Sequence, residues 1–379
     1  MIHVAIPIDP FSSWGGGIEY ILNLIICLNR TNELSKERHI KITAIGEDKE
    51  YSEISNGIRQ INSDIEIIHK PDGVQMKKVL ESIKADICFP VFDSVYRECN
   101  IPQIHYIADL QEEYLQSFFT FDEILHRRKC NRYILGAAKH ILVSSPTVKR
   151  DIEKFYDLPM VNCHVLPCLP LSNKSYWDTS DYDISRYDLP ENYYLVSNQF
   201  WKHKDHITVF RAVDHIVNTL HQKVNVVCTG LMEDYRDPFY IESLKNYLKE
   251  KKLNNYIWLL GYIPRGEQIE IMKKSNGVIQ PTLFEGGAGG FAAQEAISFG
   301  RRVIVSDIEI NKELEKFGRV YYFLHGNYID LANKILELGK DNTSYSIEMA
   351  ARIFNDHSEK LSDFYCGLME EVINDEIVG

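Results

Sequence analysis

Short runs of β-branched and aromatic residues alternate with longer helical patterns along almost the whole chain. In the first half, the strand patterns cover 2–8, 40–45, 65–68, 86–89, 103–107, 140–143 and 163–166. The helical patterns between them cover 17–30, 74–83, 121–137 and 147–156. This alternation predicts an α/β protein with parallel sheets whose faces are covered by helices.

The alternation is broken once, by a polar and turn-rich segment over 171–192, which we interpret as a linker. It then restarts, with strand patterns over 193–197, 224–229, 256–260, 277–280, 302–305 and 320–323. Helical patterns follow over 205–220, 239–252, 266–275, 291–299 and 327–339. We therefore expect a first Rossmann-like lobe over 1–170, a second over 193–345 and a closing helical stretch over 346–379.

Composition excludes several classes of protein. Apolar residues make up 45% and charged residues 25% of the 379 residues, which argues against disorder. A formal charge of −12 makes general nucleic-acid binding unfavourable. No apolar run reaches the roughly 18–20 residues of a membrane span. The first eight residues have the pattern of a strand rather than of a signal peptide. The eight cysteines include no C-x-x-C pair, so we expect reduced thiols and a cytoplasmic protein.

A glycine-rich turn between a strand and a helix is the sharpest local signal. The strand ends near Gln280, the turn holds Gly286, Gly287, Gly289 and Gly290, and a helix opens near Phe291. Glycines allow backbone N–H groups to approach a ligand closely, and a helix N-terminus favours a diphosphate. Glu285 enters the turn and Glu295 lies one turn into the helix, where carboxylates can accept hydrogen bonds from sugar hydroxyls.

A basic cluster follows the first strand of the second lobe. Asn198 comes at the strand end, and Lys202, His203 and Lys204 follow it closely. A fixed cation at a strand end can stabilise the charge that a departing diphosphate develops. We expect Lys202 and His203 to be solvated loop residues.

These two segments resemble the retaining nucleotide-sugar glycosyltransferases of the GT-B fold (the glycosyl transferases group 1 type). The resemblance implies two Rossmann-like lobes with a cleft between them. It also implies that Glu295 binds the donor ribose, that Glu285 lies beside the donor sugar hydroxyls, and that Lys204 contacts the donor diphosphate. This chain departs from the family pattern in the nine residues that separate the two glutamates, where seven are usual, and in Asn198, where an Arg is usual.

Two segments of the first lobe fit the same resemblance. Gly15, Gly16 and Gly17 form a turn after the first strand, and the resemblance places such a turn across the cleft from the donor diphosphate. Its spacing lacks the G-x-G-x-x-G pattern of dehydrogenases. Asp109, Gln111 and Glu112 follow a later strand and are acceptor-side candidates, with Glu112 at the position of the family's His. Asp109 can also serve as a helix N-cap.

Three further signals are weaker. The basic run over 126–132 is either a solvated helix face or a patch for an anionic lipid, which would allow peripheral contact with the inner membrane face. Asp181 and Asp183 form a D-x-D pair inside the linker, where we expect solvated acids. Arg301 and Arg302 are expected to be solvated charges at a helix end. No His or Cys grouping has metal-ligand spacing, so no metal or cofactor is expected.

The resemblance implies a retaining, metal-independent transfer of a sugar from a nucleoside-diphosphate sugar to an acceptor hydroxyl. By analogy, the acceptor is a glycan, a glycolipid or a lipid diphosphate in polysaccharide or glycolipid biosynthesis. Glu285, Lys204 and Asp109 are the catalytic candidates. Two alternatives share the fold: a nucleotide-sugar 2-epimerase, and a partner subunit that binds nucleotide sugars without catalysis.

Overall fold

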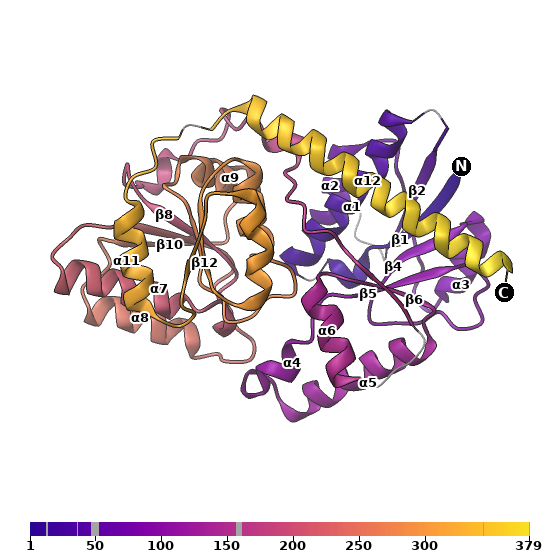
Figure 1. Cartoon of the computed structure of the whole chain (residues 1–379), viewed down its shortest axis with the longest axis horizontal. Coiled ribbons are helices and arrows are strands. Elements are labelled where there is room, and N and C mark those ends of the chain that lie inside the picture. The colour runs from indigo at the N-terminus through magenta and orange to yellow at the C-terminus, as the bar shows by residue number, and fades with distance from the viewer. Residues whose placement is uncertain (13, 36, 47–52, 157–160, 344, 379) are drawn as a thin grey trace. The chain divides into compact units, whose positions relative to one another are not determined.

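The computed structural model shows two compact α/β units (Figure 1). It describes residues 1–12, 14–35, 37–46, 53–156, 161–343 and 345–378. Unit 1 comprises residues 1–113, 121–175 and 354–379, and unit 2 comprises residues 114–120 and 176–353. The chain thus passes from unit 1 to unit 2 within the predicted linker, between Ser175 and Tyr176.

Unit 1 is built on a seven-stranded sheet in the order β3-β2-β1-β4-β5-β6-β7, with every neighbouring pair parallel. The strands are β1 (Ile2–Pro7), β2 (Ile40–Gly46), β3 (Glu66–His69), β4 (Ile87–Val91), β5 (Gln103–Ile107), β6 (His140–Val143) and β7 (Asn162–Val165). The strand order reverses between β1 and β4, as in Rossmann-type sheets.

Helices cover both faces of this sheet. They are α1 (Gly15–Leu34), α2 (Glu53–Ile61), α3 (Met76–Ile83), α4 (Gln111–Tyr114), α5 (Phe121–Ala137), α6 (Pro146–Phe155) and the long α12 (Ile347–Val378). On one face, Ile141 and Val143 of β6 pack with Ile134 of α5 and Val148 of α6. Elsewhere in unit 1, Ser362 of α12 hydrogen-bonds Thr31 of α1, with 2.6 Å between the two hydroxyl oxygens.

Unit 2 repeats the plan with a six-stranded parallel sheet in the order β10-β9-β8-β11-β12-β13. Its strands are β8 (Tyr194–Ser197), β9 (Val226–Thr229), β10 (Ile257–Gly261), β11 (Val278–Gln280), β12 (Val303–Ser306) and β13 (Val320–Phe323). The main helices are α7 (His206–Asp214), α8 (Tyr240–Glu250), α9 (Arg265–Lys274), α10 (Gly290–Ser298) and α11 (Tyr328–Leu338). Here the strand order reverses between β8 and β11.

Two parallel α/β sheets confirm the predicted fold class, and each of the thirteen predicted strands is present within one or two residues. Helix α2 was not predicted. The predicted helix 205–220 is α7 followed by a wider helical turn over 215–219. Among the described residues, no helix is both long and apolar enough to cross a bilayer.

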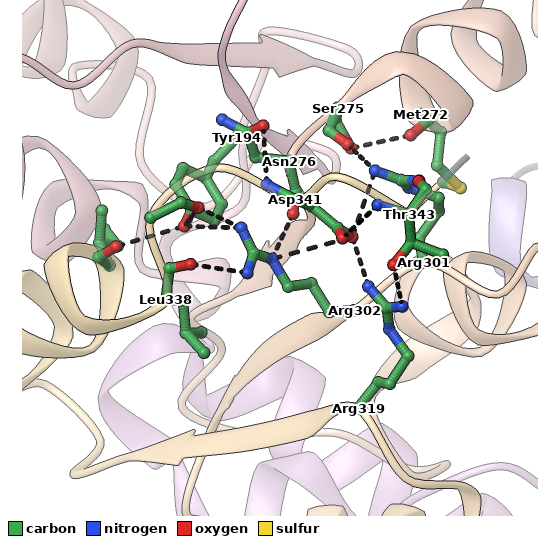
Figure 2. Close-up of polar contacts among 12 residues, drawn as sticks. Tyr194, Met272, Ser275, Asn276, Arg301, Arg302, Arg319, Leu338, Asp341 and Thr343 are labelled. Carbon is green, nitrogen blue, oxygen red and sulfur yellow. Dashed lines mark hydrogen bonds and ion pairs between the residues drawn. The ribbon is translucent and has the colours of Figure 1, made fainter. Parts of the chain in front are cut away.

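Three arginines of unit 2 converge on one carboxylate (Figure 2). Arg301, Arg302 and Arg319 lie 3.3, 4.0 and 2.5 Å from the Asp341 carboxylate. Arg301 also donates to the carbonyl of Ser275. Charge attraction between buried groups this close is strong, so Asp341 stabilises the positive charges of the buried Arg301 and Arg302, while the Arg319 side chain is 37% exposed.

The prediction that Arg301 and Arg302 are solvated was wrong. They are 4% and 6% exposed, because their guanidinium groups contact Asp341 and backbone carbonyls instead of water. Arg302 donates to the carbonyls of Asn276 (2.5 Å) and Leu338 (2.8 Å). Residues 275–277 precede β11 and Arg302 precedes β12, so this cluster supports the amino ends of the strands. Ligands of open α/β sheets bind at the opposite, carboxyl ends.

Candidate active site

The polar side chains of unit 2 gather where β8 and β11 end, at the reversal of the strand order. Asn198, directly after β8, donates its side-chain amide to Gln280, the last residue of β11, at 2.8 Å. Both side chains are buried, at 9% and 1% exposure. The hydrogen bond joins the two strands at the point where this class of sheet binds its ligand.

Glu285 and Lys204 continue this array. The Lys204 ammonium lies 2.6 Å from Glu285 Oε1, and the Gln280 amide donates to the same oxygen at 2.9 Å. The side chains of Lys204 and Glu285 are only 14% and 9% exposed. The structure thus brings together four residues from two distant segments, three of them predicted donor-site residues and one, Gln280, not.

The glycine-rich turn holds Glu285 against the first turn of α10. Gly289 and Gly290 have φ angles of +67° and +59°, a conformation that glycine adopts without strain. A Cβ at Gly290 would lie 3.0 Å from the Gln280 amide and 3.2 Å from both Glu285 carboxylate oxygens. The backbone at Gly290 therefore lies so close to Gln280 and Glu285 that only a glycine fits without a shift of these side chains. Helix α10 begins at Gly290, so the positive end of its dipole lies beside Glu285 and Gln280.

The other glycines of this turn are half-buried. The carbonyl of Gly287 accepts from the Gly290 N–H at 3.0 Å, which closes the turn, and Gly286 and Phe291 flank that hydrogen bond. The Gly289 N–H donates to Asn311 at 2.8 Å. The side-chain amide of Gln294 donates to the Ala288 carbonyl at 2.9 Å, so the turn is held by its own backbone and by the amides of Asn311 and Gln294.

Glu295 lies in a second network, which sequence reasoning missed. Arg265, the first residue of α9, donates to both carboxylate oxygens of Glu295, at 2.8 and 2.9 Å. Arg265 also donates to Gln268 at 2.6 Å, and Gln268 in turn donates to Ser197 at the end of β8. Both contacts come from one guanidinium nitrogen, Nη2, and hydrogen bonds between charged groups are strong, so Arg265 holds Glu295 in place.

The residues around Lys204 differ from the expected solvated loop. His203 is 4% exposed, and Arg236 lies 3.2 Å from its Nδ1 atom. Asp234 in turn pairs with Arg236 and accepts from the Lys202 N–H. The prediction that His203 is solvated was therefore wrong, whereas Lys202 is exposed as expected and pairs with Asp237 at 2.9 Å.

Burial also changes the titration of the two residues after Lys204. It raises the pKa of Asp205 to about 6, with hydrogen bonds from Thr208 acting in the opposite direction. Burial and, to a smaller extent, the Lys204 charge lower the pKa of His206 to about 3. The His206 ring stacks on Phe200, 4.0 Å between centroids, so it is a neutral core residue that supports the Lys204 turn.

In unit 1, the glycine turn opens α1. Gly15 is its first residue, and a Cβ at Gly17 would lie 2.6 Å from the Phe11 carbonyl oxygen and 2.7 Å from the Trp14 ring. Gly17 is therefore required for the close approach of the turn, while Gly15 and Gly16 place N–H groups at a helix N-terminus. Their predicted role opposite the donor diphosphate stays a prediction.

The acceptor-side candidates lie at the carboxyl end of β5. Asp109 accepts from the Gln111 N–H at 3.2 Å, which is a capping contact at the start of α4. Glu112 is 0% exposed and accepts from Asn131 of α5 at 3.1 Å. Burial raises the pKa of Glu112, and the nearby Arg127 opposes that rise. Glu112 thus holds α4 against α5, and the acceptor role of the three residues stays a prediction.

The comparisons with known proteins agree with this geometry. Residues 181–355 match the family model "Glycosyl transferases group 1". None of the curated proteins matches the chain in sequence. Among solved structures, sucrose-phosphate synthase from Thermosynechococcus elongatus is similar with a TM-score of 0.68 at 15% identity, over 98% of this chain and 100% of that one.

Two further structures have the same fold. A glycosyltransferase from Rickettsia africae has a TM-score of 0.64 at 14% identity, over 98% of both chains. Anabaena HepE, solved in complex with UDP and glucose, has a TM-score of 0.63 at 12% identity, over 100% of both chains. The resemblance drawn from the sequence is therefore confirmed at the level of the family: residues 181–355 match the glycosyl transferases group 1 family model, within a chain that has the GT-B fold.

Proposed function

We propose that this glycosyltransferase moves a sugar from a nucleoside-diphosphate sugar to an acceptor hydroxyl, with retention and without a metal in the reaction. The observation that carries the proposal is the Lys204–Glu285 pair, 2.6 Å apart, at the carboxyl ends of β8 and β11 beside the α10 N-terminus. A similar structure, Anabaena HepE, was solved with UDP and glucose, which supports a nucleotide-sugar donor here.

Lys204 and the α10 N-terminus would stabilise the leaving group. An ammonium has three N–H donors, and Glu285 Oε1 accepts one of them, so two remain for phosphate oxygens. Asn198 stands at the family's Arg position and its amide is bound to Gln280, so no second cation comes from there. The charge that develops on the diphosphate therefore depends on Lys204 and the helix amides.

The carboxylates would position the donor. Glu285 has a second oxygen, Oε2, for hydroxyls of the sugar, and Glu295 would accept from the ribose while Arg265 keeps its orientation. In the transfer step the bond between the anomeric carbon and the phosphate oxygen breaks, and a bond to the acceptor oxygen forms on the same face. The acceptor proton passes to the leaving phosphate oxygen, so no strong protein base is needed.

A nucleotide panel followed by product analysis tests this function. We expect one of UDP, GDP or dTDP to raise the melting temperature, since a ligand at 100 times its Kd stabilises the native state by about 2.7 kcal/mol. The matching sugar nucleotides, supplied with candidate glycan and lipid-diphosphate acceptors, should then yield a new glycoside. A changed free sugar would instead identify a 2-epimerase, and binding without turnover a non-catalytic partner.

We also propose peripheral membrane contact through α5 of unit 1, which would place a lipid-linked acceptor near the enzyme. Phe121 and Leu125, 77% and 39% exposed, share a helical face with the exposed Lys129 and Arg132. Arg128, in contrast, is paired with Glu113 at 2.5 Å. Apolar side chains beside basic ones favour the surface of an anionic bilayer.

Co-sedimentation with phosphatidylglycerol vesicles measures this contact. Each basic residue near an anionic surface contributes about 1 kcal/mol, so Lys129→Gln with Arg132→Gln should weaken binding by about 30-fold. Lys245→Gln with Lys249→Gln, two exposed lysines of α8 in unit 2, is the matched control. Equal binding of both double variants would remove α5 from the proposed contact.

A further inference from the structure

A buried histidine, His140, and a partly buried one, His164, lie on the same face of the sheet of unit 1. His140 opens β6, and His164 lies in β7, where the register pairs His164 with Leu142 and His140 with Asn162. Residues two apart on a strand point to one face, so both imidazoles project from the same side. Ile141 and Val143 point to the opposite face, into the core formed with α5 and α6. The histidine side is covered by the last turns of α12, which also belong to unit 1.

Two acidic residues of α12 lie beside the two histidines, and the four side chains form one compact polar group. His140 Nδ1 and His164 Nε2 are 3.2 Å apart, and Glu371 Oε1 of α12 lies 4.0 Å from His164 Nε2. One ligand atom from each of these three residues lies within 4.8 Å of the others. Asp375, one helical turn after Glu371, lies 3.3 Å from the other ring nitrogen of His140, Nε2.

These distances fit a metal ion better than a chain of hydrogen bonds. Two nitrogens bound tetrahedrally to one Zn²⁺ at about 2.0–2.1 Å lie roughly 3.3–3.4 Å apart, close to the 3.2 Å between the histidines. A single N–H···N hydrogen bond would leave Glu371, at 4.0 Å, without a partner in the group.

Asp375 supplies the second observation. Metal-binding histidines usually donate their other ring N–H to a carboxylate, which fixes the tautomer and turns the free nitrogen toward the metal. Asp375 Oδ2, 3.3 Å from His140 Nε2, favours a proton on Nε2, and that tautomer has a bare Nδ1 facing His164. Because the His140 side chain is 2% exposed, its ring is held in this orientation.

We propose that His140 Nδ1, His164 Nε2 and the Glu371 carboxylate bind one divalent transition-metal ion, with water as the fourth ligand. Asp375 is a positioning residue for His140. The Glu371 side chain is 53% exposed, so the site opens to solvent on one side and can be loaded from it. The ion would join α12 to β6 and β7, beside the Lys139–Glu376 ion pair at 2.8 Å. This role is separate from the transfer reaction, whose proposed residues in unit 2 include none of these ligands.

Zinc titration of the chelator-treated full-length chain tests the proposal. We expect calorimetry to show one tight equivalent of Zn²⁺, and Co²⁺ in its place to give the visible absorption of a low-coordinate cobalt site. His164→Asn and Glu371→Gln should abolish both signals. Asp375→Asn should keep the cobalt spectrum but weaken binding by about 10- to 100-fold, since only an outer-shell partner is lost.

His39→Asn is the matched control, because His39 is an exposed histidine of unit 1. It should bind Zn²⁺ like the unchanged chain. The Glu371 and Asp375 side chains are about half exposed, so their amide variants should fold, which far-UV circular dichroism verifies. Equal zinc binding by the unchanged chain and by His164→Asn would place the metal on other groups, such as thiols, and overturn the site. Absence of binding by the unchanged chain would show that the histidines share only a hydrogen bond.

Discussion

Replacing Lys204 by alanine is expected to lower kcat at saturating donor by about 100- to 1,000-fold, the usual cost of one transition-state charge contact. The effect should be at the large end because Asn198, at the family's Arg position, carries no charge to substitute for the ammonium. Single-turnover and steady-state rates with the donor found in the nucleotide panel measure it. Glu285→Gln, which keeps the side-chain shape, should also reduce kcat.

Lys202→Ala is the matched control for Lys204→Ala. Both lysines lie in the same short turn, but Lys202 is exposed and pairs with Asp237 rather than with Glu285. Its loss should leave kcat nearly unchanged. Turnover by Lys204→Ala as fast as by Lys202→Ala would remove Lys204 from the stabilisation of the leaving group. Melting curves of both variants show whether a loss of turnover comes from the lost contact or from unfolding of the protein.

Replacing Asp341 by alanine is expected to destabilise unit 2 by about 3–5 kcal/mol, the cost of leaving a buried charge without its partner. The Arg301 and Arg302 side chains, 4% and 7% exposed, would keep their positive charges with no carboxylate between them. Urea unfolding, followed by a probe in unit 2, measures the change. Asp181→Ala, an exposed acid of the linker segment, should shift the midpoint little.

The lowered pKa of Asp341 also predicts that the stability of the protein depends on pH. Burial alone would raise the pKa of Asp341, but the Thr343 N–H and the charges of Arg319 and Arg301 lower it below the ordinary value. A lowered folded-state pKa contributes stability above the unfolded-state pKa of about 3.9, and this contribution is lost as the pH falls through the folded-state value. The stability difference between the unchanged chain and Asp341→Ala should therefore narrow below about pH 4. A constant difference down to pH 2 would contradict the assigned role.

The fold could be predicted because its signal is local. Each strand is a short β-branched run, and each major helix has its own apolar period, so neighbouring residues suffice to place them. Helix α2 escaped prediction because Glu53–Ile61 is short and holds a central glycine, Gly57. Arg301 and Arg302 were misplaced since their exposure depends on Asp341 and on backbone carbonyls that precede another strand, which no local pattern shows.

The candidate site was predictable only in part. The glycine turn and Lys204 come directly after strands, so parallel topology brings them to one edge of the sheet. Arg265 and Gln268 lie in the first turn of α9, where no sequence motif marks them. Only the fold brings Arg265 into contact with Glu295, and Gln268 into contact with Arg265. His140, His164 and Glu371 are far apart in the sequence, so a search for ligand spacing could not associate them. Spacing rules detect sites within one turn or hairpin, not those assembled by a returning helix.

Helix α12 has a consequence for how the protein is made. Residues 354–379 belong to unit 1, yet they leave the ribosome after all of unit 2 has been synthesised. Until then Thr31 lacks its hydrogen bond to Ser362, and Phe89 lacks its ring contact with Tyr365. Unit 1 can therefore complete its core only after all of unit 2 has been synthesised.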